Sequence, residues 1–337
     1  MAVTMEDVAR LAGVSKKTVS NVINNYPYLR PETRARVEDA IATLQYKVNV
    51  SARNLRSGRT GMIALAIPEL GQPYFAELAQ SVIWAAARFD LTVFVETTGS
   101  ELERERSVLS GARRSLVDGF IYSPFAMGPA YAAEIPLDLP LVLLGERAFD
   151  RPVDHVAMAN EAGARAAVDH LLDQGCRRIA LIGVDPDDEP GAATLRVAGA
   201  LGAMTDRGVA PVPELLVNPG VWHMDTGATA MQGLIDSGLE FDAVFCLNDA
   251  LAIGALRSLL RNGVSIPGDV CVVGFDDTQS AAYSTPALTS VSPSRDAIAE
   301  LAVTLLHRRL TQDVPLADRK QIIAPFELKI RESSLRH

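Results

Sequence analysis

The side chains best suited to nucleic-acid chemistry lie near the start of the chain. Lys16 and Lys17 begin a predicted short helix, and Thr18, Ser20 and Asn21 share its polar side. Lysine can donate to O6 and N7 of guanine, and asparagine can pair with adenine. When such a helix follows a tight turn, its N-terminal residues meet base edges in the major groove. A solvated surface helix has similar residues, so this pattern alone leaves both interpretations open.

Sequence patterns for catalysis and metal binding are missing. The chain has no G-x-x-x-x-G-K-[ST] loop, no H-E-x-x-H helix and no G-x-S-x-G turn. Its five histidines show no metal-ligand spacing: His155, His170, His223, His307 and His337. His223 stands beside Trp222, where a cleft position and a satisfied loop histidine both fit. We therefore predict no enzyme activity, no cofactor and no metal.

The cysteines and the N-terminus indicate the compartment. Cys176, Cys246 and Cys271 form no C-x-x-C pair, and an odd number does not fit a disulfide framework. We expect buried free thiols in a reducing cytoplasm. The first residues carry acids and no apolar run, and no apolar run in the chain approaches the ~18 residues of a membrane span. We expect a soluble cytoplasmic protein without a membrane partner.

Three short helices are predicted to position the polar side chains of the N-terminal segment. Thr4 and Asp7 have the spacing of a capping box for a first helix, and Gly13 interrupts that helix. Ser15 is placed to cap a second helix over residues 16–24, and Pro31 to begin a third. Their expected inward residues are Val8, Ala9, Leu11, Val19, Val22, Ile23, Val37, Ile41 and Leu44. Two short helices joined by a turn with glycine are typical of a helix-turn-helix.

The charge of the chain is unevenly distributed. The whole chain carries 32 basic and 41 acidic side chains, a net charge of -9, which argues against a nucleic-acid partner. Residues 1–60, however, contain ten basic and five acidic side chains, a net +5, and the remainder has a net -14. A basic head on an acidic body indicates a polyanion-binding module joined to another domain. Charge alone does not exclude a chance fluctuation.

Residues 4–24, TMEDVARLAGVSKKTVSNVIN, closely resemble the DNA-binding signature of the LacI (lactose-repressor-like) family. The resemblance implies that Lys16 and Lys17 are main base readers. It implies phosphate contacts near Thr4, Ser15, Thr18, Asn24 and Thr33, and we add Lys47 as a phosphate contact. Most members have arginine where this chain has Asn21, which indicates a different operator preference. Tyr46 matches an aromatic that we interpret mainly as part of the small core.

Residues 49–58 continue the resemblance as a hinge between two domains. The segment is polar and too short to be stable as an isolated helix. In the family this helix folds only on DNA, and Leu55 matches a leucine inserted at the operator centre, where an apolar wedge kinks the duplex. Packing of Leu55 on the neighbouring domain is the alternative. Arg53 and Arg56 suit phosphate contacts. The expected domains are residues 1–48, a hinge over 49–60 and a core over 61–337.

From Gly61 the chain alternates short apolar strands with amphipathic helices. This alternation predicts parallel sheets with helices on both faces, and 277 residues are too many for one sheet. The expected fold is an N-terminal all-α helix-turn-helix head plus an α/β periplasmic-binding-protein-like core of two doubly wound lobes. The resemblance implies three crossings, placed near Ala157, Thr289 and Ala324. The lobes would then cover about 61–157 with 290–323, and about 158–289 with 324–337.

A ligand is expected between the lobes, at the carboxyl ends of the strands. The effector-binding candidates follow strands or match family motifs: Tyr74, Phe75, Glu77, Glu146, Arg196, Trp222, Asn248, Asp249 and Asp276. Arg196 matches the arginine that clamps effector groups in the family, and Trp222 could stack on a sugar. Loop capping and inter-lobe ion pairing are the alternatives for the polar side chains. Ala159-Asn160 and Ser292-Pro293 depart from the family near the cleft.

We predict a sequence-specific transcription regulator, most simply a repressor, that binds a near-palindromic operator as a homodimer. The choice between dimer and tetramer stays open. A carbohydrate is the favoured effector and a purine the alternative. Two competing classes are a transport-type small-molecule binding protein and an enzyme on the same fold. The first would not need residues 1–60, and the second would need the catalytic pattern that is missing.

Overall fold

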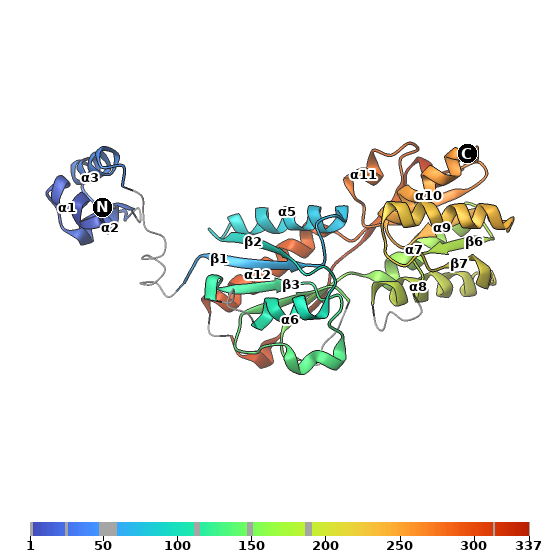
Figure 1. The fold of residues 1–337 in the computed structure, drawn as a ribbon, viewed down its shortest axis with the longest axis horizontal. Helices are drawn as coiled ribbons and strands as arrows, with labels where there is room; N and C mark the ends of the chain where they lie inside the picture. Colours follow the sequence, from blue (N-terminus) through green and yellow to red (C-terminus); the bar gives the residue numbers. More distant parts are fainter. Residues whose placement is uncertain are drawn as a thin grey trace. The chain divides into compact units, whose positions relative to one another are not determined.

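The computed structural model describes residues 3–23, 26–46, 59–110, 115–146, 151–185, 191–312 and 314–336. By its internal contacts the chain divides into two units, Met1–Thr60 and Gly61–His337. The first is a small helical head, and the second contains two α/β lobes (Figure 1). The expected fold class is confirmed.

Three helices build the head: α1 (Met5–Ala12), α2 (Lys16–Ile23) and α3 (Pro31–Thr43). The capping box at Thr4 is present, and Gly13 ends α1 with a left-handed φ of 65°. The helices bury one small core: Val8, Ala9, Ala12, Val19, Val22, Val37 and Ala40. The expectation for Leu11 was wrong, because its side chain is 54% exposed. Leu11 lies off the arc that Val8, Ala9 and Ala12 share on a helix of about 3.6 residues per turn.

The first lobe is built on a parallel six-stranded sheet with the order β11-β5-β4-β3-β1-β2. Its strands are β1 (Met62–Ile67), β2 (Thr92–Thr97), β3 (Gly119–Tyr122), β4 (Leu141–Leu144), β5 (Asp154–Ala157) and β11 (Gln321–Ile323). Its helices are α5 (Pro73–Ala87), α6 (Leu102–Ser110), α12 (Arg295–Thr311) and two 3₁₀ turns, Pro129–Glu134 and Leu316–Asp318. Alternate residues of β1 face opposite sides, so Ile63 and Leu65 join one core and Ala64 and Ala66 another.

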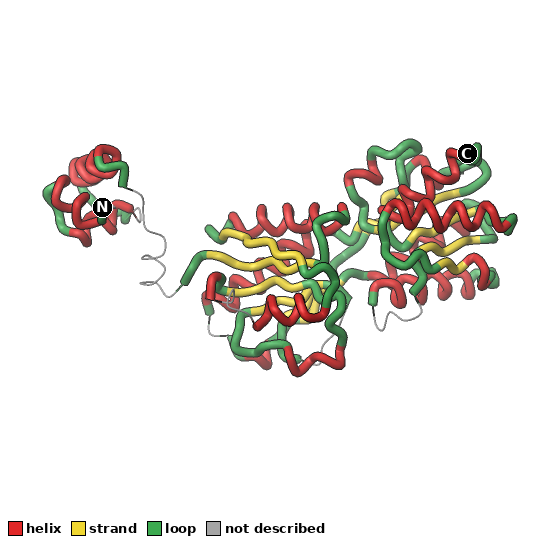
Figure 2. Tube along the Cα trace, viewed as in Figure 1, coloured by secondary structure: helices red, strands yellow, loops and turns green. Residues whose placement is uncertain are grey.

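The second lobe has a six-stranded sheet with the order β12-β10-β9-β8-β6-β7, in which only β12 is antiparallel to its neighbour. Its strands are β6 (Ile179–Ile182), β7 (Leu216–Val217), β8 (Ala243–Cys246), β9 (Cys271–Phe275), β10 (Thr289–Ser292) and β12 (Glu327–Lys329). Its helices are α7 (Asn160–Asp173), α8 (Ala192–Asp206), α9 (Met224–Ser237), α10 (Asp249–Arg261), α11 (Gln279–Ala282) and the 3₁₀ turns Pro213–Leu215 and Glu332–Ser334. Helices cover both faces of each sheet (Figure 2).

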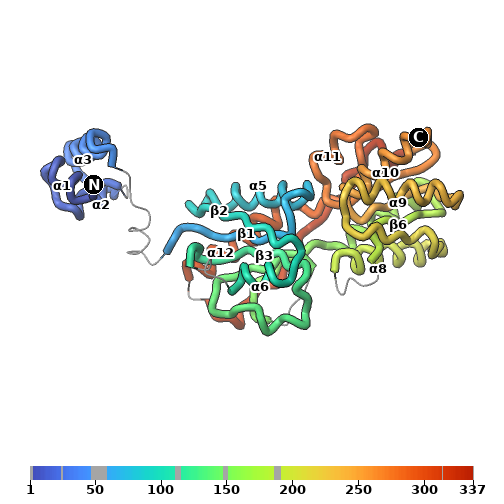
Figure 3. The backbone as a smooth tube through the Cα atoms, in the orientation of Figure 1, coloured from blue at the N-terminus to red at the C-terminus, as the bar shows by residue number. Residues whose placement is uncertain are grey.

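The chain passes between the lobes after β5, after β10 and after β11, so neither lobe is continuous. Figure 3 shows the late, orange-red α12 among the blue and green elements of the first lobe. The second crossing was expected near Thr289, and this was wrong by a few residues. Thr289–Ser292 forms β10, which pairs with β9 and β12 in the second lobe, so the chain leaves that lobe only after Ser292.

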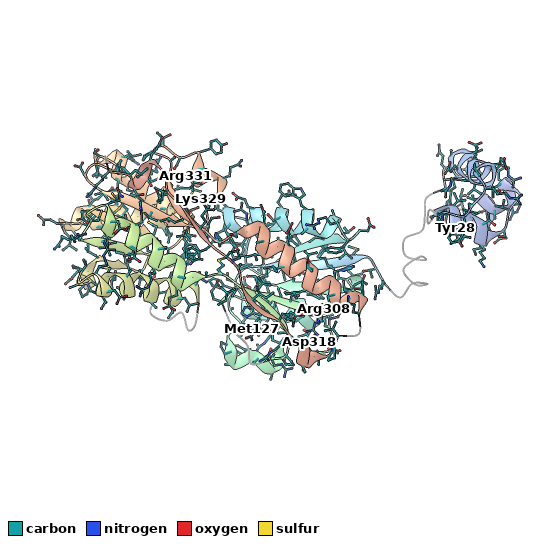
Figure 4. All side chains as sticks on the ribbon, turned by 180° about the vertical axis from the view of Figure 1, so that it is seen from behind. Tyr28, Met127, Arg308, Asp318, Lys329 and Arg331 are labelled. Carbon is teal, nitrogen blue, oxygen red and sulfur yellow. The ribbon has the colours of Figure 1, made fainter. Side chains whose placement is uncertain are left out.

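Ion pairs stabilise the late segments of the chain. Arg308 of α12 pairs with Asp318 in the first lobe, and Arg331 pairs with Asp277 at 2.6 Å in the second. Figure 4 labels three of these side chains and Lys329 of β12. The chain leaves β5, β10 and β11 at their carboxyl ends to cross between the lobes, so these strand ends face the crossings, where a ligand site is expected.

Candidate functional site

Helix α2 presents its first two side chains to solvent. Lys16 and Lys17 are exposed, and Thr18, Ser20 and Asn21 are half-buried. The first turn contains no acidic residue. Cations at a helix N-terminus oppose the helix dipole by about 0.3–1 kcal/mol, so their position does not favour stability. A phosphate backbone would supply the missing anions, which supports contact with DNA over a merely solvated face.

Hydroxyl groups cap the two helices of the motif. The Ser15 hydroxyl accepts a hydrogen bond from the Thr18 amide at 3.1 Å and lies 2.9 Å from the Thr18 hydroxyl. The Thr4 hydroxyl donates to the Asp7 carboxylate at 2.7 Å, and these contacts lower the pKa of Asp7. Thr33 is half-buried in the first turn of α3. The hydroxyls of Thr4 and Ser15 therefore have a structural role whether or not DNA is bound.

One head residue that the sequence pattern did not single out is Tyr28. Its side chain is 84% exposed, and its ring packs edge-on against Tyr26 with 5.6 Å between centroids (Figure 4). Several predicted DNA contacts lie outside the described residues: Asn24, Lys47, Arg53, Leu55 and Arg56.

Arg196 is the centre of the candidate effector site. It lies on α8, and only 3% of it is exposed. Its Nε donates to Asn160 Oδ1 at 2.7 Å, its Nη1 donates to the Leu247 carbonyl, and Asp276 Oδ1 is 3.7 Å from Nη1. Within the described residues, the contact of Nη2 is the weak acceptor Met158 Sδ at 3.5 Å. Nη2 is thus the donor best placed for a ligand oxygen.

Aromatic rings flank the guanidinium of Arg196. Its central carbon lies 3.6 Å from the ring centroid of Phe275 and 5.7 Å from that of Trp222. Cations within about 6 Å of a ring centroid are attracted to the ring face. Phe275 ends β9, and Trp222 precedes α9, so two separate elements fix the orientation of the arginine.

The loop that carries Asp276 is held in an unusual backbone conformation. Asp276 and Asp277 have φ values of 110° and 49°, which non-glycine residues rarely adopt. The Asp277 amide donates to the Ser290 hydroxyl at 3.0 Å, and Arg331 Nη2 donates to Asp277 at 2.6 Å. Such strain persists where surrounding contacts determine it, as at binding sites. Burial raises the pKa of Asp276, and the nearby Arg196 opposes the rise.

The first lobe adds Tyr74 and Glu146 to this group. Asn160 at the start of α7 donates to Glu146 Oε1 at 2.8 Å, across the two lobes. Burial, followed by the charges of Asp276 and Glu146, raises the pKa of the Tyr74 phenol. The structure thus brings together five of the predicted effector residues: Tyr74, Glu146, Arg196, Trp222 and Asp276.

Asn248 and Asp249 act first within their own lobe. Asn248 caps α10, because its Oδ1 accepts from the Leu251 amide at 2.8 Å, and its Nδ2 donates to the Trp222 carbonyl at 3.3 Å. Asp249 is fully buried and accepts from Thr278 at 2.7 and 3.0 Å and from Ser290 at 2.6 Å. Burial raises the pKa of Asp249 to about 7. Direct effector contact by Asp249 is not supported, since both carboxylate oxygens already hold the loop of Asp276.

The carboxylate of Glu77 is occupied by contacts within and between the lobes. Its Oε2 pairs with Arg295 Nη1 at 2.8 Å in the same lobe, and its Oε1 accepts from the Gln279 amide of the other lobe at 2.9 Å. Nε of Arg295 is buried without a partner among the described residues. Phe75 is half-buried and packs edge-on against Tyr74 with 5.3 Å between centroids. The inter-lobe alternative therefore fits Glu77 better than ligand contact.

A second inter-lobe contact lies beside Trp222. His223 Nε2 is 2.8 Å from Glu69 Oε1, and Gln72 Nε2 donates to the Trp222 carbonyl at 3.4 Å. Sequence reasoning missed Glu69, Arg295 and the role of Asn160. The Ala159-Asn160 pair was the one available signal, although the departure from the family lies at Ala159 and Asn160 is the usual residue. The other contacts join residues more than 150 positions apart or follow no motif.

The described parts of the chain contain no candidate metal site and no candidate membrane span. There, no three His, Cys, Asp or Glu side chains gather closely enough to hold a metal ion. None of the described helices combines the length and the apolar character that crossing a membrane requires.

Comparison with known proteins matches both units. The family model "Bacterial regulatory proteins, lacI family" matches residues 4–49, and "Periplasmic binding protein-like domain" matches residues 168–334. The chain is 32% identical to the ribose operon repressor of Halalkalibacterium halodurans, over 98% of this chain and 97% of that protein.

Two solved structures resemble the chain over its whole length. The transcriptional regulator CelR in complex with cellobiose has a TM-score of 0.71 and 30% identity, covering 98% of this chain and 99% of that one. The lac repressor dimer bound to operator and an anti-inducer has a TM-score of 0.85 and 25% identity, covering all of both chains. Both resemblances include the head and both lobes.

Proposed function

Because this chain belongs to the lacI family of bacterial regulatory proteins, we propose that it is a cytoplasmic, non-catalytic repressor whose operator binding is controlled by a sugar in the inter-lobe cleft. The chain is a sequence-specific DNA-binding transcription regulator with a helix-turn-helix head. The identity of the effector and the roles of individual residues are the proposed part.

The observation that carries the proposal is the setting of Arg196. Its buried guanidinium faces the Asp276 carboxyl at 3.7 Å and lies against Phe275 and near Trp222. Fixed donors and acceptors beside aromatic faces suit a ligand with many hydroxyls and apolar ring faces. A ribose operon repressor and a regulator complexed with cellobiose are among its relatives, which supports a carbohydrate.

The inter-lobe contacts suggest how ligand binding between the lobes affects DNA binding by the head. Asn160–Glu146, Gln279–Glu77 and His223–Glu69 all join the first lobe to the second. A sugar that binds Arg196 and Glu146 together changes the balance between these contacts and alternative lobe arrangements. A ligand shifts such an equilibrium only by its differential affinity for the two states. We propose that a homodimer, as in the lac repressor–operator complex, transmits this change to two half-sites.

The experiment begins by selecting binding sequences from random duplex DNA with the full chain. The selected operator is then used in gel shifts with ribose, cellobiose, other sugars and guanine. We expect a near-palindromic consensus and a shift of operator affinity by at least one sugar. If no consensus sequence is recovered, sequence-specific DNA binding is contradicted. If operator affinity responds to guanine alone, the proposal of a sugar effector is contradicted.

A further inference from the structure

The polar groups at the centre of the candidate effector site are buried. Arg196 and Asn248 are each 3% exposed, and Asp276 is 6% exposed. A sugar can reach these side chains only when a segment that covers them moves away. Segments that open in this way are drawn from loops with few buried apolar contacts. A loop at the carboxyl ends of the strands is therefore expected to open before a sugar binds.

The loop over residues 218–223 joins β7 to α9 and reaches from the protein surface to Arg196. The ring centroid of its Trp222 lies 5.7 Å from the guanidinium carbon of Arg196, and Val221 beside it is 59% exposed. Met224, the first residue of α9, is 40% exposed. The loop is thus a thin cover on the side of Arg196 that faces Trp222.

Short-range hydrogen bonds give this loop a shape of its own. The Gly220 amide donates to Asn218 Oδ1 at 2.8 Å, and Gly220 has a left-handed φ of 75°, which favours glycine. The Thr226 hydroxyl of α9 donates to the Val221 carbonyl at 2.6 Å, and the His223 amide donates to Thr226 Oγ1 at 3.1 Å. A loop ordered in this way can move as a unit about its two ends.

Side chains of the first lobe hold this loop in place. His223 Nε2 lies 2.8 Å from Glu69 Oε1, and the ring donates from Nε2 because an ionised carboxylate only accepts. The Trp222 carbonyl accepts from Gln72 Nε2 of the first lobe at 3.4 Å and from Asn248 Nδ2 of its own lobe at 3.3 Å. Both of these bonds are longer than the usual distance of about 2.9–3.0 Å. The bond between His223 and Glu69 has a charged acceptor and is the strongest of the three.

We propose that residues 218–223 are a gate over the effector site and that the pair of Glu69 and His223 is its latch. A sugar reaches Arg196 when the latch pair separates and the loop moves away. The latch joins side chains outside the group that contacts Arg196, so it is expected in the free chain and in the sugar complex alike. Loss of the latch therefore speeds both entry and release of the sugar and leaves its Kd nearly unchanged. Sugar binding rests on the proposed function, whereas opening of the gate is measured without a sugar.

The first test uses acrylamide quenching of Trp222 fluorescence in the full chain with Trp84→Phe. The chain has two tryptophans, and Trp84 on α5 is 65% exposed, so its removal leaves Trp222 as the reporter. The bimolecular quenching constant, corrected for the fluorescence lifetime, rises with the fraction of open gate. His223→Ala and Glu69→Gln should each raise this constant by about two- to fivefold, as for the loss of a partly exposed ion pair. The double variant should show no further rise, because the two side chains act as one pair.

Asp206→Asn in the same Trp84→Phe chain is the matched control. Asp206 pairs with Arg165 at 2.7 Å within the second lobe, and both side chains are partly exposed, like those of the latch. The control should leave the quenching constant unchanged. The Tm of every variant is measured alongside, since general loosening of the second lobe would expose Trp222 in the control as well.

The second test follows Trp222 fluorescence in stopped flow with ribose and with cellobiose. For a sugar that binds, each latch variant should raise the association and dissociation rate constants by a similar factor. A direct contact between His223 and the sugar predicts a different result, in which dissociation is faster, association is unchanged and the Kd is higher. That result would contradict the assignment of His223 to the latch.

Two quenching results would overturn the gate. The first is a quenching constant that both latch variants leave at the value of the parent chain. The second is an equal rise in Asp206→Asn. If no sugar binds, the sugar effector of the proposed function is contradicted, and the quenching constants still decide for or against the gate.

Discussion

At the scale of single residues, Arg196 carries most of the argument about the effector. It contacts Asn160, Leu247 and Asp276 within one lobe and keeps Nη2 against a weak acceptor. We predict that Arg196→Ala abolishes the effector response of the gel shift while operator affinity without effector stays within about threefold. Arg196→Lys retains the charge but not the planar set of donors, and should restore little of the response.

Thermal unfolding serves as the control for Arg196→Ala. The substitution leaves Asp276 buried without its cation, so some loss of stability is expected. A variant that still binds operator and still responds to the sugar would contradict the central place of Arg196.

Lys16 and Lys17 are the residues predicted to read bases. Each substitution to alanine should weaken binding to the cognate operator by about 1–3 kcal/mol and relax the preference at one base position. Arg36 on α3 is a matched exposed cation, and Arg36→Ala should leave the consensus unchanged. Repeated selection from random DNA measures both effects. An unchanged consensus for both lysine variants would assign them to the phosphate backbone instead.

At the scale of elements, helices and strands with a clear apolar pattern could be predicted from the sequence, and short strands could not. Helix α2 was predicted over residues 16–24 and spans Lys16–Ile23, and the alternation predicted from Gly61 begins with β1 at Met62, since apolar periodicity marks both. The strands β10, β11 and β12 were not predicted, because they have three or four residues each and two of them are partly exposed. Their place depends on pairing with distant strands, which local pattern does not encode.

The same limit applies to the candidate site. Arg196 and Asp276 follow from motifs and Trp222 from its aromatic ring, and the structure brings the three together. The inter-lobe pairs of Glu77 with Gln279 and of Glu69 with His223 join positions more than 150 residues apart, so only the folded chain shows them. Asp249 matched a motif, yet its role is to hold a loop of its own lobe.

Asp249, at the start of α10, is expected to make the free energy of unfolding depend on pH. Folding raises its pKa to about 7, so between about pH 4 and 7 the folded chain binds more protons than the unfolded chain. The contribution of Asp249 to the free energy of unfolding therefore falls as pH rises through this interval, by up to about 1.4 kcal/mol per pH unit. Asp249→Asn cannot ionise and should show a shallower fall in denaturant titrations at pH 4.5 and 6.5. Equal slopes for the two proteins would contradict the raised pKa.

At the scale of the whole molecule, the net charge of -9 is the sum of a basic part, which is expected to bind DNA, and an acidic part, which is expected to bind the effector. The head carries +5 and the rest of the chain -14. The acidic core is expected to confine DNA contact to the head. We predict that log Kd for non-specific duplex rises with log salt with a slope that reflects only head and hinge cations. Arg165→Ala and Arg207→Ala, on the core, should leave this slope unchanged.

A salt slope that falls for the core variants as much as for Lys16→Ala would contradict this division. Fluorescence anisotropy with a labelled non-specific duplex is sufficient for the measurement.

The central claim is that the cleft and the head are coupled, and thermodynamic reciprocity tests it most directly. Calorimetry gives the Kd of the responsive sugar for the full chain, free and saturated with the selected operator, and gel shifts give the operator Kd with and without the sugar. The account predicts that both pairs change by the same factor, and that Arg196→Ala removes both changes. An operator Kd that a saturating sugar leaves unchanged, or changes that persist in Arg196→Ala, would contradict it.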